Sequence, residues 1–296
     1  MASVVNRLDK LNLINPPAWL PHNTLFEGWT GSVAYGASSD NSDIDVVGFA
    51  MPPKDIVFPH LAGEIQGFGT QIQRFDQYQQ HHVLDKSTGK EYDITVYSIV
   101  KFFQLVMENN PNMVDNMFLP RRCVLHSTAV YEHMRTHRKM FLHKGAYHKF
   151  RGYALSQMSK INKGTNRANP KRQVSIDKYG YDVKFAYHVV RLLLEAEQIM
   201  STGDLRLDRD SEVYKSIRKG EWTLDRLAKW TEEKERSLET LYADSSLPER
   251  PDEKKIKKLL IECLEMHYGN LSEAVVEQDK HERLVRDLEE LVNKHR

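Results

Sequence analysis

The hydrophobic period of the sequence changes near residue 99, and this change limits the folds that the chain can adopt. Before that point, three segments have the residue types and alternation of β-strands: TLFEGW at 24–29, SDIDVVGFAMP at 42–52 and HHVLDKSTGKEYDITVYS at 81–98. The third predicts a hairpin with its turn at 87–90. From Ile99 onward apolar residues recur at helical spacing, and beyond about residue 120 no segment is a convincing strand. The sequence therefore predicts an α+β chain, with a small mixed sheet followed by an all-α bundle.

With 296 residues the chain is long enough for two domains, which we place at 1–120 and 121–296. Within residues 1–24 the apolar pattern predicts a short amphipathic helix that Pro16 and Pro17 end. Further helices are predicted at 99–110, 146–163, 181–200 and 223–243, followed by a final helical pair after Pro251. The segment KGTNRANPKRQV at 163–174 is basic and contains glycine and proline, which is typical of a loop. We expect that loop to be mobile and to lie near the helix at 181–200.

Composition excludes several classes of protein. The formal net charge is +1, so any affinity for nucleic acid must come from local patches. Cys123 and Cys263 are far apart and neither has a CxxC companion, which excludes a disulfide framework and a cysteine zinc site. The N-terminal residues lack the pattern of a signal peptide, and no apolar run approaches membrane-spanning length. We therefore expect a cytoplasmic protein without a membrane partner.

Asp43 and Asp45 share one face of the second predicted strand. Side chains at i and i+2 of a strand project together about 7 Å apart, so Ile44 and Val46 face the opposite side. Adjacent carboxylates repel each other unless a cation lies between them. A pair of Mg²⁺ ions about 3.5–4 Å apart is the usual reason for such an arrangement, and Mn²⁺ can take the same place. The spacing thus predicts two metal ions with Asp43 and Asp45 as ligands.

A two-metal site generally needs a third carboxylate from elsewhere in the sheet. Asp93 meets this need because it lies in a predicted strand with Thr95 and Tyr97 on its face and Ile94 opposite. Glu91 shares that face and is the alternative ligand.

Gly31 and Ser32 form a tight turn about a dozen residues before the two aspartates. Glycine permits a tight backbone, and the serine hydroxyl can donate a hydrogen bond to a phosphate oxygen. Backbone N–H groups at the start of a following helix would also point at the anion. A phosphate-binding turn and a metal pair on neighbouring elements can together hold a nucleoside triphosphate.

These residues are familiar as a set. GSVAYGASSDNSDID at 31–45 resembles the GS…DxD signature of the DNA polymerase β-like nucleotidyltransferases. Three further blocks, which begin YDITVYS, FRGYALSQ and GYDVKFAYHVV, resemble one branch of that superfamily, the predicted nucleotidyltransferases linked to RNA repair in bacteria and phages. The resemblance covers roughly residues 25–230, and the last sixty or so residues match no motif.

The resemblance implies a nucleotidyltransferase-like catalytic domain at 1–120 and transfer of an NMP from an NTP such as ATP, with release of pyrophosphate. It implies that Asp43, Asp45 and Asp93 bind two Mg²⁺ or Mn²⁺ ions and perform catalysis, and that Gly31 and Ser32 bind the nucleotide phosphates. It implies an RNA acceptor, such as a tRNA or an RNA end. A protein or small-molecule acceptor is an alternative, and a nucleotide-binding module without turnover is another.

Lys184, His188 and Arg191 form one polar stripe on the otherwise apolar helix at 181–200. The resemblance includes this stripe and implies nucleotide binding by all three residues, with Lys184 and Arg191 contacting phosphates or the acceptor. A solvated or domain-bridging face would show the same pattern. Lys163, Arg167, Lys171 and Arg172 make the loop at 163–174 basic, so the loop is a second candidate contact for a nucleic-acid backbone or a triphosphate.

Overall fold

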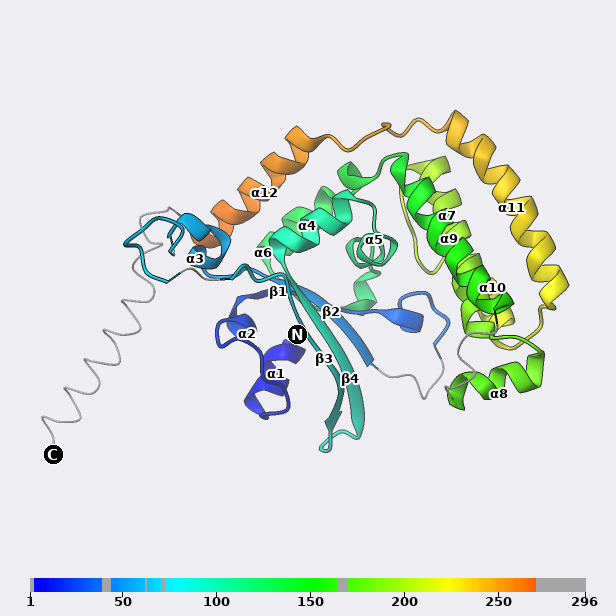
Figure 1. The fold of residues 1–296 in the computed structure, drawn as a ribbon, viewed down its shortest axis with the longest axis horizontal. Helices are drawn as coiled ribbons and strands as arrows, with labels where there is room; N and C mark the ends of the chain where they lie inside the picture. Colours follow the sequence, from blue (N-terminus) through cyan, green and yellow to red (C-terminus); the bar gives the residue numbers. More distant parts are fainter. Residues whose placement is uncertain (1–2, 39–43, 62, 71–72, 164–169, 270–296) are drawn as a thin grey trace, which may run out of the picture.

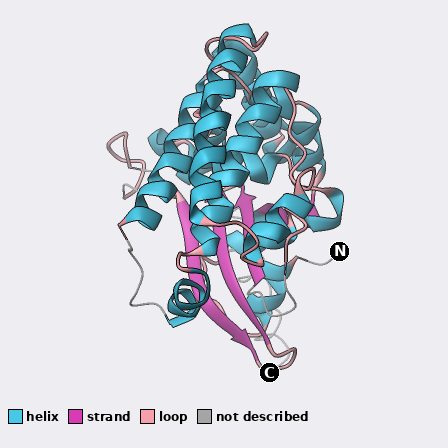
Figure 2. Cartoon of the chain, turned by 90° about the vertical axis from the view of Figure 1, so that its right-hand side faces the viewer, coloured by secondary structure: helices cyan, strands magenta, loops and turns pink. Residues whose placement is uncertain are grey.

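A five-stranded mixed sheet occupies one side of the molecule and most helices lie on the other (Figures 1 and 2). The computed structural model describes residues 3–38, 44–61, 63–70, 73–163 and 170–269. The strands run in the order β3-β4-β2-β1-β5. Only β2 and β4 pair in parallel, and the other neighbours are antiparallel. The strands are β1 (Thr24–Trp29), β2 (Ile44–Ala50), β3 (Gln77–Asp85), β4 (Lys90–Ser98) and β5 (Val124–Ser127).

The helices in the first half of the chain are short. They are α1 (Val4–Lys10), α2 (Leu20–Asn23), the 3₁₀ helix η1 (Gly31–Val33), α3 (Lys54–Val57), η2 (Pro59–Leu61), α4 (Ile99–Met107), α5 (Pro111–Met117), η3 (Arg121–Cys123), α6 (Ala129–Thr136) and η4 (Arg138–Phe141). The helices that follow, most of them longer, are α7 (Gly145–Asn162), α8 (Pro170–Tyr179), α9 (Val183–Thr202), α10 (Ser211–Arg218), α11 (Leu224–Asp244) and α12 (Glu253–Tyr268). None of the helices within the described ranges is long and apolar enough to cross a membrane.

The expected α+β architecture is confirmed, with two corrections to its elements. The expectation that no strand follows residue 120 is wrong, because β5 pairs with β1 and forms an edge of the sheet. The segment expected to be a loop at 163–174 is helical from Pro170 onward in α8, while residues 164–169 lie outside the described part. The division at residue 120 stays a prediction.

Alternation along the strands divides the sheet into two faces. Val46, Ile94 and Val96 are fully buried against α1 and α2 in a smaller core. The opposite face of β2 carries Phe49 into a larger core that continues through the helices as far as Tyr268. Residues of β2 and β4 that are offset by one from the smaller core therefore face the helices. Both Asp45 and Asp93 are on this helical side.

Glu27, in the middle of β1, is fully buried and caps α1 on the far face of the sheet. Its carboxylate accepts hydrogen bonds from the backbone N–H of Val4 at 2.6 Å and of Val5 at 3.2 Å, and from the Ser3 hydroxyl. Burial raises the pKa of the Glu27 carboxyl, against the effect of these donors. One side chain of the central sheet thus satisfies the free N–H groups at the start of a helix.

Replacing Glu27 should detach α1 from the sheet. Glu27→Leu leaves three donors without their acceptor, so we expect it to lower the free energy of unfolding by about 2–4 kcal/mol. Glu27→Gln keeps one acceptor oxygen and should lose less. Urea denaturation of both variants measures the difference, and a Leu variant as stable as the wild type would contradict the capping role.

Candidate active site

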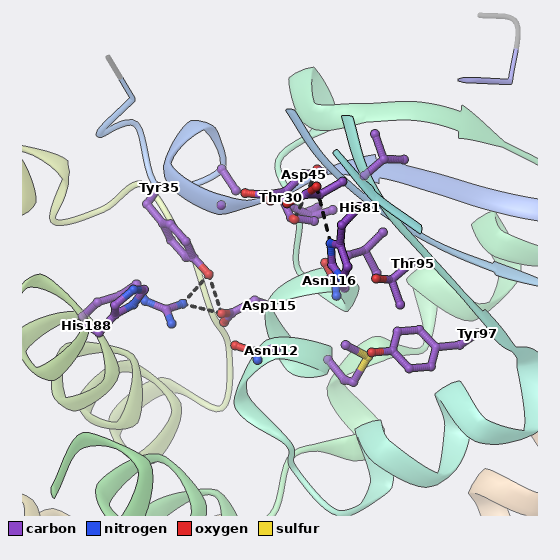
Figure 3. A pocket seen from close by; sticks show the side chains of 18 residues that line it. Thr30, Tyr35, Asp45, His81, Thr95, Tyr97, Asn112, Asp115, Asn116 and His188 are labelled. Atoms are coloured by element: carbon purple, nitrogen blue, oxygen red, sulfur yellow. Dashed lines mark hydrogen bonds and ion pairs between the residues drawn. The ribbon is translucent and has the colours of Figure 1, made fainter. Parts of the chain in front are cut away.

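Asp45 and Asp93 lie opposite each other in the parallel ladder of β2 and β4. Paired strands are about 4.8 Å apart, and both residues project toward the helices, so their carboxylates are neighbours. Both line a cavity of about 280 Å³ between the sheet, α5 and α9 (Figure 3). The structure thus brings Asp93 beside Asp45, while their role as metal ligands stays a prediction. Asp43 lies outside the described residues.

Gly31 fixes the turn against Asp45. Its φ is +70°, and a Cβ at this position would lie 2.5 Å from Oδ2 of Asp45. The backbone N–H of Thr30 donates to the carbonyl of Asp45 at 2.8 Å, which holds the two segments together. The helix expected after the turn is only the three-residue 3₁₀ helix η1. Gly31 lines the cavity, whereas Ser32 is half-buried beside it and is not one of the lining residues.

Alternate side chains of β4 point to the same face, as the sequence pattern predicts. Asp93, Thr95 and Tyr97 line the cavity. Glu91, the alternative ligand, is instead paired with the imidazole of His82 at 2.6 Å and does not line it. No cluster of three or more His, Cys, Asp or Glu side chains that could hold a metal occurs among the residues described.

His81 reaches the cavity through an irregularity in β3 that sequence reasoning missed. The β3–β4 register shifts between Gln80 and Val83, and His82 has a φ of +55°. The N–H of His82 consequently donates to Oδ1 of Asp93 at 2.8 Å, and Nδ1 of His81 lies 3.4 Å from the same oxygen. A bulge redirects side chains that simple alternation assigns to the other face.

Arg191 lines the cavity but is held by a buried network. Its guanidinium contacts the Tyr35 hydroxyl and Oδ2 of Asp115, and lies 3.3 Å from Oε1 of Glu195. The Tyr35 hydroxyl also donates to Asp115 at 2.6 Å. These residues come from the turn after β1, from α5 and from α9, so the network joins the helices to the sheet. Arg191 is only 2% exposed, and its described contacts are structural.

The network contains two buried carboxyl groups for one arginine. Burial raises the pKa of Asp115 and raises that of Glu195 well above its ordinary value, while Arg191 opposes both shifts. Oε2 of Glu195 has no hydrogen-bond partner among the described residues. A second buried negative charge is expensive, so we assign the proton to Glu195 at neutral pH.

The other two residues of the polar stripe have different positions. His188 lines the cavity, and Lys184 is exposed one turn before it on α9. Burial lowers the pKa of His188 well below its usual value, and four surrounding cations act in the same direction. These cations are Lys184, Arg172, Arg191 and Arg218. Partial burial of its ammonium group and the nearby Arg172 lower the pKa of Lys184, and the Asp45 carboxylate acts in the opposite direction.

Arg172 is not part of a mobile loop, contrary to expectation. It belongs to α8, where its guanidinium contacts both oxygens of Asp182 at 2.8 Å and lies 4.7 Å from the centre of the Phe185 ring. Asp182 in turn caps α9 by accepting from the N–H of Lys184. Lys163 ends α7, Arg167 lies outside the described residues, and Lys171 belongs to α8. The cations beside the cavity are therefore positioned by helix ends.

Comparison with known protein families gives a match that covers most of the chain. A family model described as the RNA repair pathway DNA polymerase beta family matches residues 6–262. No curated protein matches the sequence. A solved structure described as a nucleotidyltransferase-like protein from Exiguobacterium sibiricum 255-15 aligns with 98% of this chain and 88% of its own at 13% identity. Its TM-score is 0.28, which is too low to support an argument.

The proton on Glu195 predicts how stability depends on pH. A carboxyl whose pKa is raised by folding contributes stability that is complete below the unfolded pKa and is lost as pH rises through the folded value. Glu195→Gln keeps the shape and removes this titration, so we expect it to exceed the wild type in free energy of unfolding at pH 8 by about 1 kcal/mol or more.

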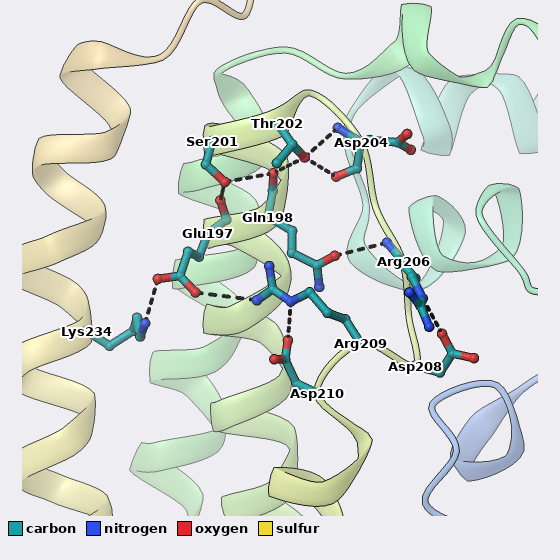
Figure 4. A network of polar contacts seen from close by, with 10 residues as sticks. All are labelled: Glu197, Gln198, Ser201, Thr202, Asp204, Arg206, Asp208, Arg209, Asp210 and Lys234. Atoms are coloured by element: carbon teal, nitrogen blue, oxygen red, sulfur yellow. Dashed lines mark hydrogen bonds and ion pairs between the residues drawn. The ribbon is translucent and has the colours of Figure 1, made fainter.

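Glu197 on the same helix is the matched control, because its carboxylate is partly exposed and pairs with Lys234 at 2.7 Å and with Arg209 at 3.5 Å (Figure 4). Glu197→Gln should not stabilise the protein at pH 8. Chemical denaturation between pH 5 and 8 makes the comparison. A Glu195→Gln variant that is less stable than the wild type at every pH would show that Glu195 is ionised in the folded state.

Proposed function

The chain belongs to the RNA repair pathway DNA polymerase beta family, and on this premise we propose that it moves an NMP from an NTP to an acceptor hydroxyl and releases pyrophosphate. The observation that carries the proposal is the pairing of Asp45 with Asp93 in register inside a cavity that Gly31 also lines. Adjacent carboxylates are destabilising on their own account and become favourable when a cation is shared. The donor atoms at the site suit a reaction on a polyphosphate.

The donor set is made of carboxylate oxygens, which suit Mg²⁺ and Mn²⁺. Asp45 and Asp93 would hold two such ions together with Asp43, two residues before Asp45 in the sequence. When bound, the ions would neutralise the triphosphate and lower the pKa of the attacking hydroxyl.

The residues of the chain would orient the reactants for in-line displacement. The acceptor oxygen forms a bond to the α-phosphorus while the bond from the α-phosphorus to the bridging oxygen breaks, and pyrophosphate leaves. Asp93 would hold one of the ions and help to take the proton of the acceptor hydroxyl. Gly31, Ser32 and the adjacent backbone would hold the β- and γ-phosphates, since the turn is hydrogen-bonded to the backbone of Asp45.

Two features support phosphate binding at the α9 side of the cavity. The cations Lys184, Arg172 and Arg218 all act on His188, so positive charge is concentrated there. Lys184 is also within electrostatic reach of Asp45. Arg191 and His188 would act differently from Lys184: Arg191 supports the cavity wall through Asp115, and a neutral His188 can accept or donate a hydrogen bond.

We propose RNA as the acceptor, because the matching family is described by an RNA repair pathway and positive charge favours an anionic substrate. Transfer to a protein or a small molecule is the alternative within the same chemistry. A nucleotide-binding module without turnover is the alternative outside it. Incubating the protein with each α-³²P-labelled NTP, Mg²⁺ or Mn²⁺ and cellular RNA separates the three.

Asp45→Asn should abolish label transfer while the protein stays folded, because it removes a charge but keeps the shape. Removing outer partners of metal ligands already costs about 10–100-fold, so we expect a loss of at least about 100-fold here. Asp244→Asn, an exposed change at the end of α11, is the control and should leave transfer unchanged. Transfer at the wild-type rate by Asp45→Asn would refute the mechanism.

The same assay identifies the acceptor. Label in RNA supports the proposal as stated, whereas pyrophosphate release without labelled RNA would move the search to protein or small-molecule acceptors. Nucleotide and Mg²⁺ binding with neither product would favour the module without turnover.

Gly31→Ala tests whether the turn positions Asp45. Gly31 and Gly89 have similar φ values, +70° and +67°, but a Cβ at Gly89 would meet nothing within 4 Å. Both substitutions should cost about 1–2 kcal/mol of stability through backbone strain. Only Gly31→Ala should also displace the Asp45 carboxylate and lower transfer by about 100-fold. Equal activity of the two variants would show that the close approach has no role.

A further inference from the structure

The cavity extends beyond the two carboxylates to a floor of uncharged side chains. Asp93, Thr95 and Tyr97 follow one another on the same face of β4, and Tyr97 lies about 13 Å along the strand from Asp93. Asn112 and Asn116, one turn apart on α5, face the same space (Figure 3). The cavity therefore has an acidic end at β2 and β4 and an amide-rich floor against α5.

The polar groups of this floor are available to a ligand. No hydrogen bond joins the side chain of Asn112, Asn116, Thr95 or Tyr97 to another residue within the described ranges. Asn116 is only 3% exposed. Buried side-chain amides are almost always hydrogen-bonded. Among the described residues, some polar side-chain atoms are inaccessible and have no hydrogen-bond partner, but the amide atoms of Asn116 do not belong to this group, so they remain accessible from the cavity. Its hydrogen-bonding capacity is thus directed into the cavity.

The rest of the floor is apolar and electrically balanced. Met113, Leu119 and Val47 line it, and the first two are buried. The nearest charges, Asp115 and Arg191, are paired with each other. Apolar surface with a few amide groups suits a flat, uncharged ring with a hydrogen-bonding edge, which describes a nucleobase.

The distribution of charge around the cavity indicates which end would hold the phosphates and which the base. Lys184, Arg172 and Arg218 all act on His188, and Lys184 is also within electrostatic reach of Asp45. Arg172 is paired with Asp182, so Lys184 is the cation of this group that we assign to the phosphates. The floor offers no unpaired cation among its described lining residues. Phosphates would therefore occupy the α9 side and the base the floor. A volume of about 280 Å³ lies at the low end for ligand pockets and suits one nucleoside better than a polymer.

We propose that Asn112, Asn116 and Tyr97 form the base subsite for the donor nucleotide, and that the two amides select the base by its hydrogen-bonding edge. This inference rests on the proposed function and names the part of the donor that the floor recognises. An asparagine amide presents a donor next to an acceptor, which matches N6 and N7 of adenine. The expected donor is therefore ATP.

Calorimetric titration of the full-length chain with Mg²⁺ and each of the four NTPs tests the proposal, with inorganic triphosphate as a probe that has no base. We expect ATP to bind at least about tenfold more tightly than the other three NTPs, which is the lower range of one two-point base contact. Asn116→Leu, which is similar in size, should weaken ATP binding by about tenfold and leave triphosphate binding unchanged. Asn112→Leu, at an exposed position, gives the same test without a risk to folding.

Asn162→Leu, exposed at the end of α7, is the matched control and should change no affinity. Equal affinity for all four NTPs in the wild type, unchanged in both floor variants, would overturn the proposal. Unchanged NTP affinity with weaker RNA binding would place the acceptor on the floor and overturn it as well. Failure of the wild type to bind both NTPs and triphosphate would instead refute the proposed function, and the base subsite with it.

Discussion

The parallel pairing of β2 with β4 is the contact on which the arrangement of the site depends. It places Asp45 opposite Asp93, although 47 intervening residues separate the two in the sequence. The pairing is fixed by the opposite faces of the same strands, because Val46, Ile94 and Val96 are buried under α1 and α2. A slip of either strand by one residue would move the apolar side chains of that strand toward the cavity and turn its carboxylate into the core. The hydrophobic effect on one face therefore sets the electrostatics on the other.

A buried ionic network determines where the helices lie relative to that sheet. Arg191 of α9 contacts Asp115 of α5 and Tyr35 from the turn after β1. Removing one partner of such a group leaves an uncompensated buried charge, which typically costs several kcal/mol. The network borders the cavity and joins the wall opposite the carboxylates to α5 and to the turn after β1. The groups that we propose to bind phosphate and the carboxylates are brought together by two different kinds of interaction.

Much of this organisation could be predicted from the sequence, because it follows from periodicity. The period of two in the strands assigned Asp43 and Asp45 to one face and Asp93 to the cavity face of its own strand, and the helical period predicted the helix at 181–200 that the structure has as α9. The role of Arg191 could not be obtained in this way, since a helical stripe does not reveal whether an arginine meets solvent or a buried aspartate. Asp115 and Asn116 were missed because they belong to a helix of seven residues.

Other features of the structure were not predicted from the sequence, for local physical reasons. β5 was missed because it is only four residues long and lies at the sheet edge, where alternation is weak. The helix α8 was not predicted because its segment is basic and contains proline, which is typical of a loop. Its first residue is Pro170, however, and proline is favoured at the first position of a helix. His81 enters the cavity only because of the bulge in β3, and no pattern of residues in the sequence predicts that bulge.

A crystal structure with Mn²⁺ and a nucleotide analogue that cannot be cleaved between the α- and β-phosphates tests the central claim most directly. Anomalous scattering locates each Mn²⁺ ion independently of the refined coordinates. We predict two peaks about 3.5–4 Å apart, both in contact with the Asp45 carboxylate and one of them also in contact with Asp93. Bound nucleotide with no Mn²⁺ between these two residues, or Mn²⁺ bound elsewhere only, would contradict that claim.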